Sequence, residues 1–238
     1  MKRLLTLFVL AAAVRAFAQE EISPEALKKM PPLPVREEAL GNAAAPVGVV
    51  VAIDEAFATQ NQNEPPKAPF TIVVPTGKGL SFMPGGKKSG NPELLKLFKA
   101  TADKHNIEML RLSSLTVPLN PDLADRLKIC AHLLKTQALP ALTKDYKDLK
   151  VIDSYATKIG GYDAACLIAQ ATAATGEVYA VKLAGILHPT LNAGVLACLV
   201  ADTKLSEVKR PEDLASKGLG LVILHSVRFV EPKTVATP

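Results

Sequence analysis

The stretches YDAACLIAQ (residues 162–170), VYAVKLAGI (178–186) and GVLACLVA (194–201) decide the fold of this chain. Each is an apolar run rich in small and β-branched side chains, which is typical of a buried strand. Gly160-Gly161 forms a tight turn before the first run, and Thr175-Gly176 forms a turn before the second. This order predicts an antiparallel meander as the core of the fold.

The segments before the meander predict both strands and helices. A capping asparagine followed by proline and an acid begins a helix at Asn91 and again at Asn120. Apolar residues at helical spacing follow each start, so helices are expected over residues 91–104 and 121–137. Strands are expected over residues 46–53, 70–74 and 107–117.

Residues 219–229 fit two structures. Their β-branched content favours a strand, whereas Leu219, Val222 and Ile223 would share one face of a helix. The residues alone leave both open.

The first 18 residues are predicted to be a secretory signal peptide. Lys2 and Arg3 form a basic start, residues 4–14 form an apolar core, and small residues precede a cleavage position after Ala18. An uncleaved anchor or a buried N-terminal helix is the alternative, although this core is too short to span a bilayer stably. The signal predicts a mature protein in the periplasm or outside the cell.

The remaining chain divides into two parts. Residues 19–45 carry several prolines and mixed charges, and we expect a flexible linker there. Residues 46–238 are expected to form a single globular α+β domain. No other segment is apolar over a membrane-spanning length, so no integral membrane segment is expected after cleavage.

The net charge gives no reason to expect a nucleic-acid partner. The leader contains Lys2, Arg3 and Arg15, and removing these three from the 28 basic residues leaves 25 against 23 acidic ones, a net charge of +2. So small an excess does not favour an anionic partner.

The chain has three cysteines, which would be exposed to oxidising conditions in the periplasm or outside the cell. Cys166 and Cys198 each lie within an apolar run, where a buried, unpaired thiol is the favoured state. A bridge between them is the alternative, because sequence does not fix connectivity. The odd count leaves at least one thiol unbridged, with Cys130 as the third cysteine.

No catalytic, cofactor or metal-binding motif is found. The glycine- and lysine-rich residues 76–90 lack the spacing of a phosphate loop, so a mobile surface loop is expected there. His225 precedes Ser226, but adjacent side chains diverge on either a helix or a strand. No zinc-ligand spacing joins the histidines, which are His105, His132, His188 and His225.

The order of the motifs resembles the PsbP-like superfamily, which includes bacterial envelope proteins of the DcrB type. The similarity covers residues 68–230 and rests on the strand PFTIVVP (69–75), the turn and strand IGGYDAA (159–165) and the end ILHSVRF (223–229). The resemblance implies an antiparallel sheet flanked by helices, an α/β/α sandwich, with residues 219–229 helical. A strand there in register with residues 195–200 would contradict it. The chain departs from the family in having no tryptophan.

The resemblance implies a non-enzymatic binding or assembly module with an envelope or secreted protein as its partner, and it transfers no site residue. The alternative is a small secreted hydrolase whose site is assembled from residues distant in sequence. Such a site needs a histidine near a carboxylate and a nucleophile, so four histidines each more than ~8 Å from such groups would exclude it.

Overall fold

The computed structural model describes residues 22–40, 46–85, 93–120, 122–142 and 146–230. The expected signal peptide and its cleavage position lie outside these residues. The described elements in chain order are α1 Pro24–Lys29, β1 Gly48–Ile53, α2 Glu55–Gln60, β2 Phe70–Pro75, β3 Leu80–Pro84, β4 Glu93–Ala100, β5 Asn106–Thr116, α3 Leu123–Leu133, the π-helical turn η2 Leu134–Ala138, α4 Leu139–Leu142, β6 Asp148–Ile159, β7 Tyr162–Thr172, β8 Val178–Leu187, β9 Ala193–Asp202, the 3-10 helix η3 Pro211–Ala215, α5 Leu219–Leu224 and β10 Arg228–Phe229.

The centre of the molecule is a seven-stranded antiparallel sheet in the order β3-β4-β5-β9-β8-β7-β6. Strands β6 to β9 are consecutive in both sequence and space, so the predicted meander is confirmed and begins one strand earlier. Strand β9 is buried along its whole length. Such two-sided burial explains why the sequence shows continuous apolar runs rather than alternation.

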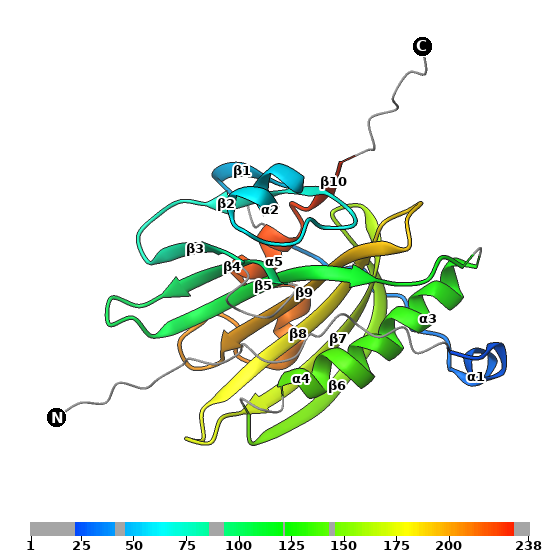
Figure 1. Cartoon of the computed structure of the whole chain (residues 1–238). Coiled ribbons are helices and arrows are strands. Elements are labelled where there is room, and N and C mark those ends of the chain that lie inside the picture. The colour runs from blue at the N-terminus through cyan, green and yellow to red at the C-terminus, as the bar shows by residue number, and fades with distance from the viewer. Residues whose placement is uncertain (1–21, 41–45, 86–92, 121, 143–145, 231–238) are drawn as a thin grey trace, which may run out of the picture.

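Each face of the sheet has its own covering layer, as Figure 1 shows. Helix α3, turn η2 and α4 pack on one face, together with α1. The other face is covered by α5, η3 and a small sheet in the order β1-β2-β10. The expected α+β architecture of an antiparallel sheet flanked by helices is confirmed.

The strand register separates two of the cysteines. Cys166 on β7 lies opposite Ala184 on β8, whereas Cys198 on β9 lies opposite Leu183. Since neighbouring residues of β8 point to opposite faces, the two thiols belong to different sides of the sheet. Cys130, Cys166 and Cys198 are all buried and form no disulfide, so the favoured prediction is confirmed and the bridge is wrong.

The helix expected over residues 91–104 is wrong, because β4 occupies this segment from Glu93. Leu94, Leu95 and Leu97 are all buried in the same apolar cluster. A bulge between Glu93 and Leu95 interrupts the alternation of the strand, so the adjacent Leu94 and Leu95 are both buried and the pattern resembles an apolar helical stripe.

Residues 219–229 divide between the two predicted structures. Residues 219–224 form α5, as the resemblance implied, and Arg228–Phe229 forms the short strand β10. β10 pairs with β2 and not with β9, so the pairing that would have contradicted the resemblance does not occur.

The loop expected over residues 76–90 contains β3, and its residues 86–90 lie outside the described part.

The linker expected over residues 19–45 is wrong for its described part, since α1 and residues 34–38 pack against the domain. Residue Val35 forms a parallel bridge with Ala156 on β6. Residues 34–38 are held against the domain because the Glu38 side chain is buried and pairs with Lys182.

Candidate functional site

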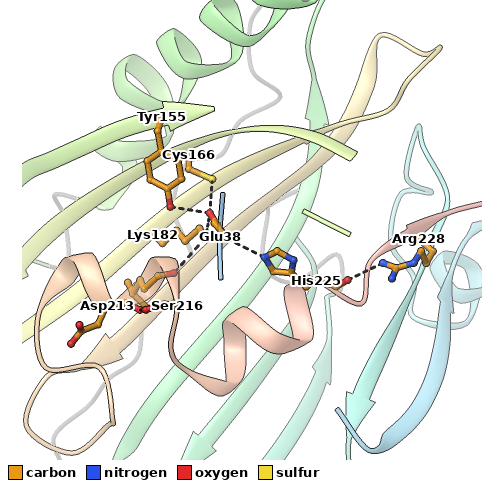
Figure 2. Close-up of polar contacts among 9 residues, drawn as sticks. Glu38, Tyr155, Cys166, Lys182, Asp213, Ser216, His225 and Arg228 are labelled. Carbon is orange, nitrogen blue, oxygen red and sulfur yellow. Dashed lines mark hydrogen bonds and ion pairs between the residues drawn. The ribbon is translucent and has the colours of Figure 1, made fainter. Parts of the chain in front are cut away.

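Inside the domain the carboxylate of Glu38 is surrounded by four polar side chains, which makes a group of five residues (Figure 2). Its Oε1 accepts hydrogen bonds from the Tyr155 hydroxyl at 2.9 Å and the Cys166 thiol at 3.6 Å. The Lys182 ammonium lies 2.6 Å from both carboxylate oxygens, and the ring nitrogen Nε2 of His225 lies 3.1 Å from Oε2. We call these five residues the Glu38 cluster.

The sheet places three members of the cluster on one face. Tyr155 on β6 lies directly opposite Cys166 on β7. Lys182 is two residues from Ala184, the partner of Cys166 on β8, so it projects to the same side. His225 follows the last residue of α5, which packs over this face. Four separate elements therefore direct their polar groups to one point.

Glu38 comes from outside the sheet, on a segment that we call the strap (residues 34–38). The strap lies along β6, where the Arg36 N–H donates to the Ala156 carbonyl at 2.9 Å and the Ala156 N–H donates to the Pro34 carbonyl at 2.8 Å. The Arg36 guanidinium pairs with Asp153 and lies 5.5 Å from the centre of the Tyr155 ring. The chain then turns inward and buries the Glu38 side chain.

The cluster holds a buried ion pair. The side chains of Glu38 and Lys182 are both 0% exposed. Burial raises the pKa of Glu38, but the hydrogen bond from His225, the charge of Lys182 and the hydrogen bonds from Lys182 and Tyr155 outweigh it and leave the pKa below its ordinary value. Burial, with Glu38 beside both groups, raises the pKa of the Tyr155 hydroxyl and of the Cys166 thiol, so both remain protonated donors.

The cluster bears directly on the hydrolase hypothesis. His225 meets a carboxylate at 3.1 Å, so the distance criterion that would have excluded a hydrolase is not satisfied. The Cys166 thiol beside this carboxylate is not an activated nucleophile, because it is buried against the carboxylate and burial raises its pKa. Ser226 is held elsewhere: its hydroxyl accepts from the Val73 N–H at 2.9 Å and donates to the Ile223 carbonyl at 2.6 Å.

The other histidines have separate places. His105 lies between β4 and β5, and His132 lies on α3. His188 accepts backbone N–H bonds from Thr190 and Leu191 at its Nδ1, which shapes the turn after β8. Across the described ranges, no three His, Cys, Asp or Glu side chains gather in a way that could hold a metal ion.

A small hollow lies between β4, β5 and the start of α5. Its volume is about 20 Å³, close to the space of one water molecule. Glu108 lines it and accepts the Gly220 N–H at 3.0 Å, which ties α5 to the sheet.

The sequence predicted no site residue: it placed His225 beside Ser226 and indicated a buried thiol at Cys166, and it did not single out Glu38, Lys182 or Tyr155. One signal was present for Lys182, a single charge at an inward position of the apolar run VYAVKLAGI. Glu38 gave no such signal, because its proline-rich surroundings resemble a linker.

No family model matches the chain, and no curated protein is similar to it in sequence. Several solved structures are similar in fold, among them the following three. Cyanobacterial PsbP from Synechocystis sp. PCC 6803 is 13% identical, with a TM-score of 0.45 over 80% of this chain and 99% of that one. LpqN of Mycobacterium tuberculosis, described as involved in cell envelope biogenesis, is 16% identical, with a TM-score of 0.41 over 76% and 90%. The Saccharomyces cerevisiae Ran-binding protein Mog1p is 10% identical, with a TM-score of 0.40 over 76% and 95%. The likeness to cyanobacterial PsbP is one of fold, at 13% identity.

Proposed function

We propose that this protein is a non-enzymatic binding or assembly module of the periplasm or the extracellular space, and that strand β1 receives an extended, uncharged segment of a partner protein. The observation that carries the proposal is the exposure of β1 at the edge of the small sheet. Val47, just before the strand, is 87% exposed, and Val49 and Val50 within it are 58% and 65% exposed, which is unusual for neighbouring apolar residues.

The backbone of β1 supports pairing with another strand. Strand β2 is hydrogen-bonded along both of its edges. One edge pairs with β1, along Gly48–Ile53, and the other bonds to β10 and to the Ser226 hydroxyl. Within the described residues β1 is paired on its β2 side only, so its outer N–H and C=O groups can extend the sheet.

The chemistry of the edge defines the partner segment. The sequence from Ala43 to Ile53 contains no charged residue, and natural sheets use charges to discourage pairing at such edges. An uncharged, β-branched segment fits this strand, whereas a charged segment would lose solvation without gaining an ion pair.

The proposed location rests on the predicted signal peptide. Among the described residues, no helix combines the length and apolarity needed to cross a bilayer. N-terminal sequencing of the protein secreted by a producing cell tests the location, and a mature chain that begins at Gln19 is the expected result.

Site-specific photocrosslinking in the envelope fraction tests the proposed binding surface. A crosslinker at Val50 should capture a partner through an extended segment, and Val49→Lys should abolish that capture. Leu205→Lys is the matched control, because Leu205 is 48% exposed but lies outside β1. Capture that survives Val49→Lys, or crosslinks that join only two copies of this chain, would overturn the proposal.

A further inference from the structure

We infer that the four donors around Glu38 form a carboxylate-binding site, that the strap occupies this site in cis, and that an acidic extended segment of a partner protein can take its place. This inference concerns the β6 side of the large sheet and does not rest on the β1 edge. It begins with the origin of the five side chains.

The four donors belong to the folded body, whereas the carboxylate does not. Tyr155, Cys166 and Lys182 project from three adjacent strands of the sheet, and His225 ends a helix packed on it. Glu38 lies on a segment held to β6 by two backbone hydrogen bonds and by the Arg36–Asp153 pair, in which the Arg36 side chain is 53% exposed. Val35 is itself 84% exposed. The donors can therefore remain in place when the strap leaves.

The site requires an anion once the strap leaves. Lys182 is completely buried, and its contacts in the described part of the chain are Glu38 and, at 3.5 Å, the Leu214 carbonyl. Without Glu38 the ammonium would be a buried charge with no ion-pair partner, which is strongly unfavourable. A neutral side chain in place of Glu38 would not supply the missing charge.

The donor geometry selects a carboxylate among anions. Oε1 faces Tyr155, Cys166 and Lys182, and Oε2 faces His225 and Lys182, so both oxygens of a planar carboxylate are satisfied. A phosphate or sulfate would bring further oxygens into a site where the described residues direct no additional donor, and it would lose their solvation.

The strap also defines the sequence of a competing segment. It runs parallel to β6 at the pairing of Val35 with Ala156, and the carboxylate follows three residues later. A competing segment should therefore be extended and carry an acidic residue three positions after the residue opposite Ala156. Because the strap is tethered, its effective concentration is in the millimolar range, so competition should be weak until the strap is weakened.

Chemical rescue of the full-length Glu38→Ala variant tests the carboxylate site. Sodium acetate should raise the Tm of this variant more than it raises the Tm of the wild type, with sodium chloride at equal ionic strength as the reference. Sodium sulfate, which stabilises proteins generally, should shift both chains equally. The acetate effect should disappear when Lys182→Met is added to Glu38→Ala. An equal acetate effect in both chains would show that the donors serve only to hold the strap.

A peptide experiment tests the replacement of the strap. The probe is a synthetic peptide of residues 33–40, LPVREEAL, and its control carries glutamine in place of Glu38. The probe should bind the Glu38→Ala chain at least tenfold more tightly than the control peptide does, and more tightly than it binds the wild type. Equal binding of the two peptides would overturn the inference.

Hydrogen exchange in the Glu38→Gln chain provides a second measurement should Glu38→Ala fail to fold, because glutamine preserves the volume of the side chain. Excess probe peptide should speed exchange of the Arg36 amide, which is bonded to Ala156 while the strap is in place. Unchanged exchange at saturating peptide would overturn the replacement of the strap.

Discussion

The ammonium of Lys182 lies 2.6 Å from both carboxylate oxygens of Glu38, a residue 144 positions earlier in the chain, and neither side chain is exposed. Burying either charge in an apolar interior costs free energy, and the attraction between the two charges offsets that cost only while both are present. The ion pair therefore links the strap to strand β8 of the large sheet.

Removing one member of this pair should be far more damaging than removing both. Lys182→Met leaves Glu38 buried without its cation and should lower the free energy of unfolding by about 3–5 kcal/mol. The double variant Glu38→Leu/Lys182→Met should recover most of that loss. Chemical denaturation of the single and double variants measures the coupling, and additive losses would contradict it.

The Glu38 carboxylate should make stability depend on pH. Its pKa in the folded chain lies below its ordinary value of 4.5, so the stabilisation is fully present above about pH 4.5 and is lost as the pH falls through the lowered pKa. The difference in unfolding free energy between wild type and Glu38→Gln should therefore shrink in acid. Urea unfolding of both chains at a series of acidic pH values measures this difference. A difference that stays constant with pH would show that the Glu38 pKa is not lowered in the folded chain.

The turn before β7 offers a matched pair of glycines. Gly160 and Gly161 have positive φ angles of 61° and 91°, which disfavour a side chain. A Cβ at Gly161 would meet nothing within 4 Å, whereas one at Gly160 would lie 2.4 Å from the Val227 carbonyl oxygen. Gly161→Ala should cost about 1–2 kcal/mol from backbone strain alone, and Gly160→Ala should cost more. Thermal unfolding measures the stability of both variants. Equal losses of stability would contradict the close approach of the Val227 carbonyl oxygen to Gly160.

The thiols should be unreactive in the folded chain. Cys130, Cys166 and Cys198 are buried, and burial raises the pKa of Cys130 to about 12. A thiol reagent should therefore label none of them at neutral pH in the native state and all three in denaturant, as intact mass would show. Rapid native labelling of Cys166 would instead indicate that the strap opens readily.

The sequence predicted the parts of the fold whose signals are local. The meander was recognisable because its strands are apolar and two of its three turns carry glycine. Helix α3 was recognisable from its periodicity, although its N-cap is Asp122 and not the predicted Asn120. The segment beginning at Glu93 misled the prediction because a bulge between Glu93 and Leu95 leaves the adjacent Leu94 and Leu95 both buried, which removes the alternation expected of a strand. Tertiary position, not local preference, determined that strand.

The Glu38 cluster was beyond local prediction for a different reason. Its contacts join Glu38 to residues 117, 128, 144 and 187 positions away, and no periodicity operates over such separations. The lone lysine in VYAVKLAGI indicated that a buried partner was needed, but any acidic residue of the chain could have supplied it.

The position of Glu38 early in the chain sets an order of events during folding. The strap is synthesised before every element it contacts, yet its carboxylate has no site until β6, β7, β8 and α5 have assembled. We therefore expect Glu38 to insert late, after the folding transition state. Variants of Glu38 should unfold faster while folding at an almost unchanged rate, so the ion pair governs how long the native state persists.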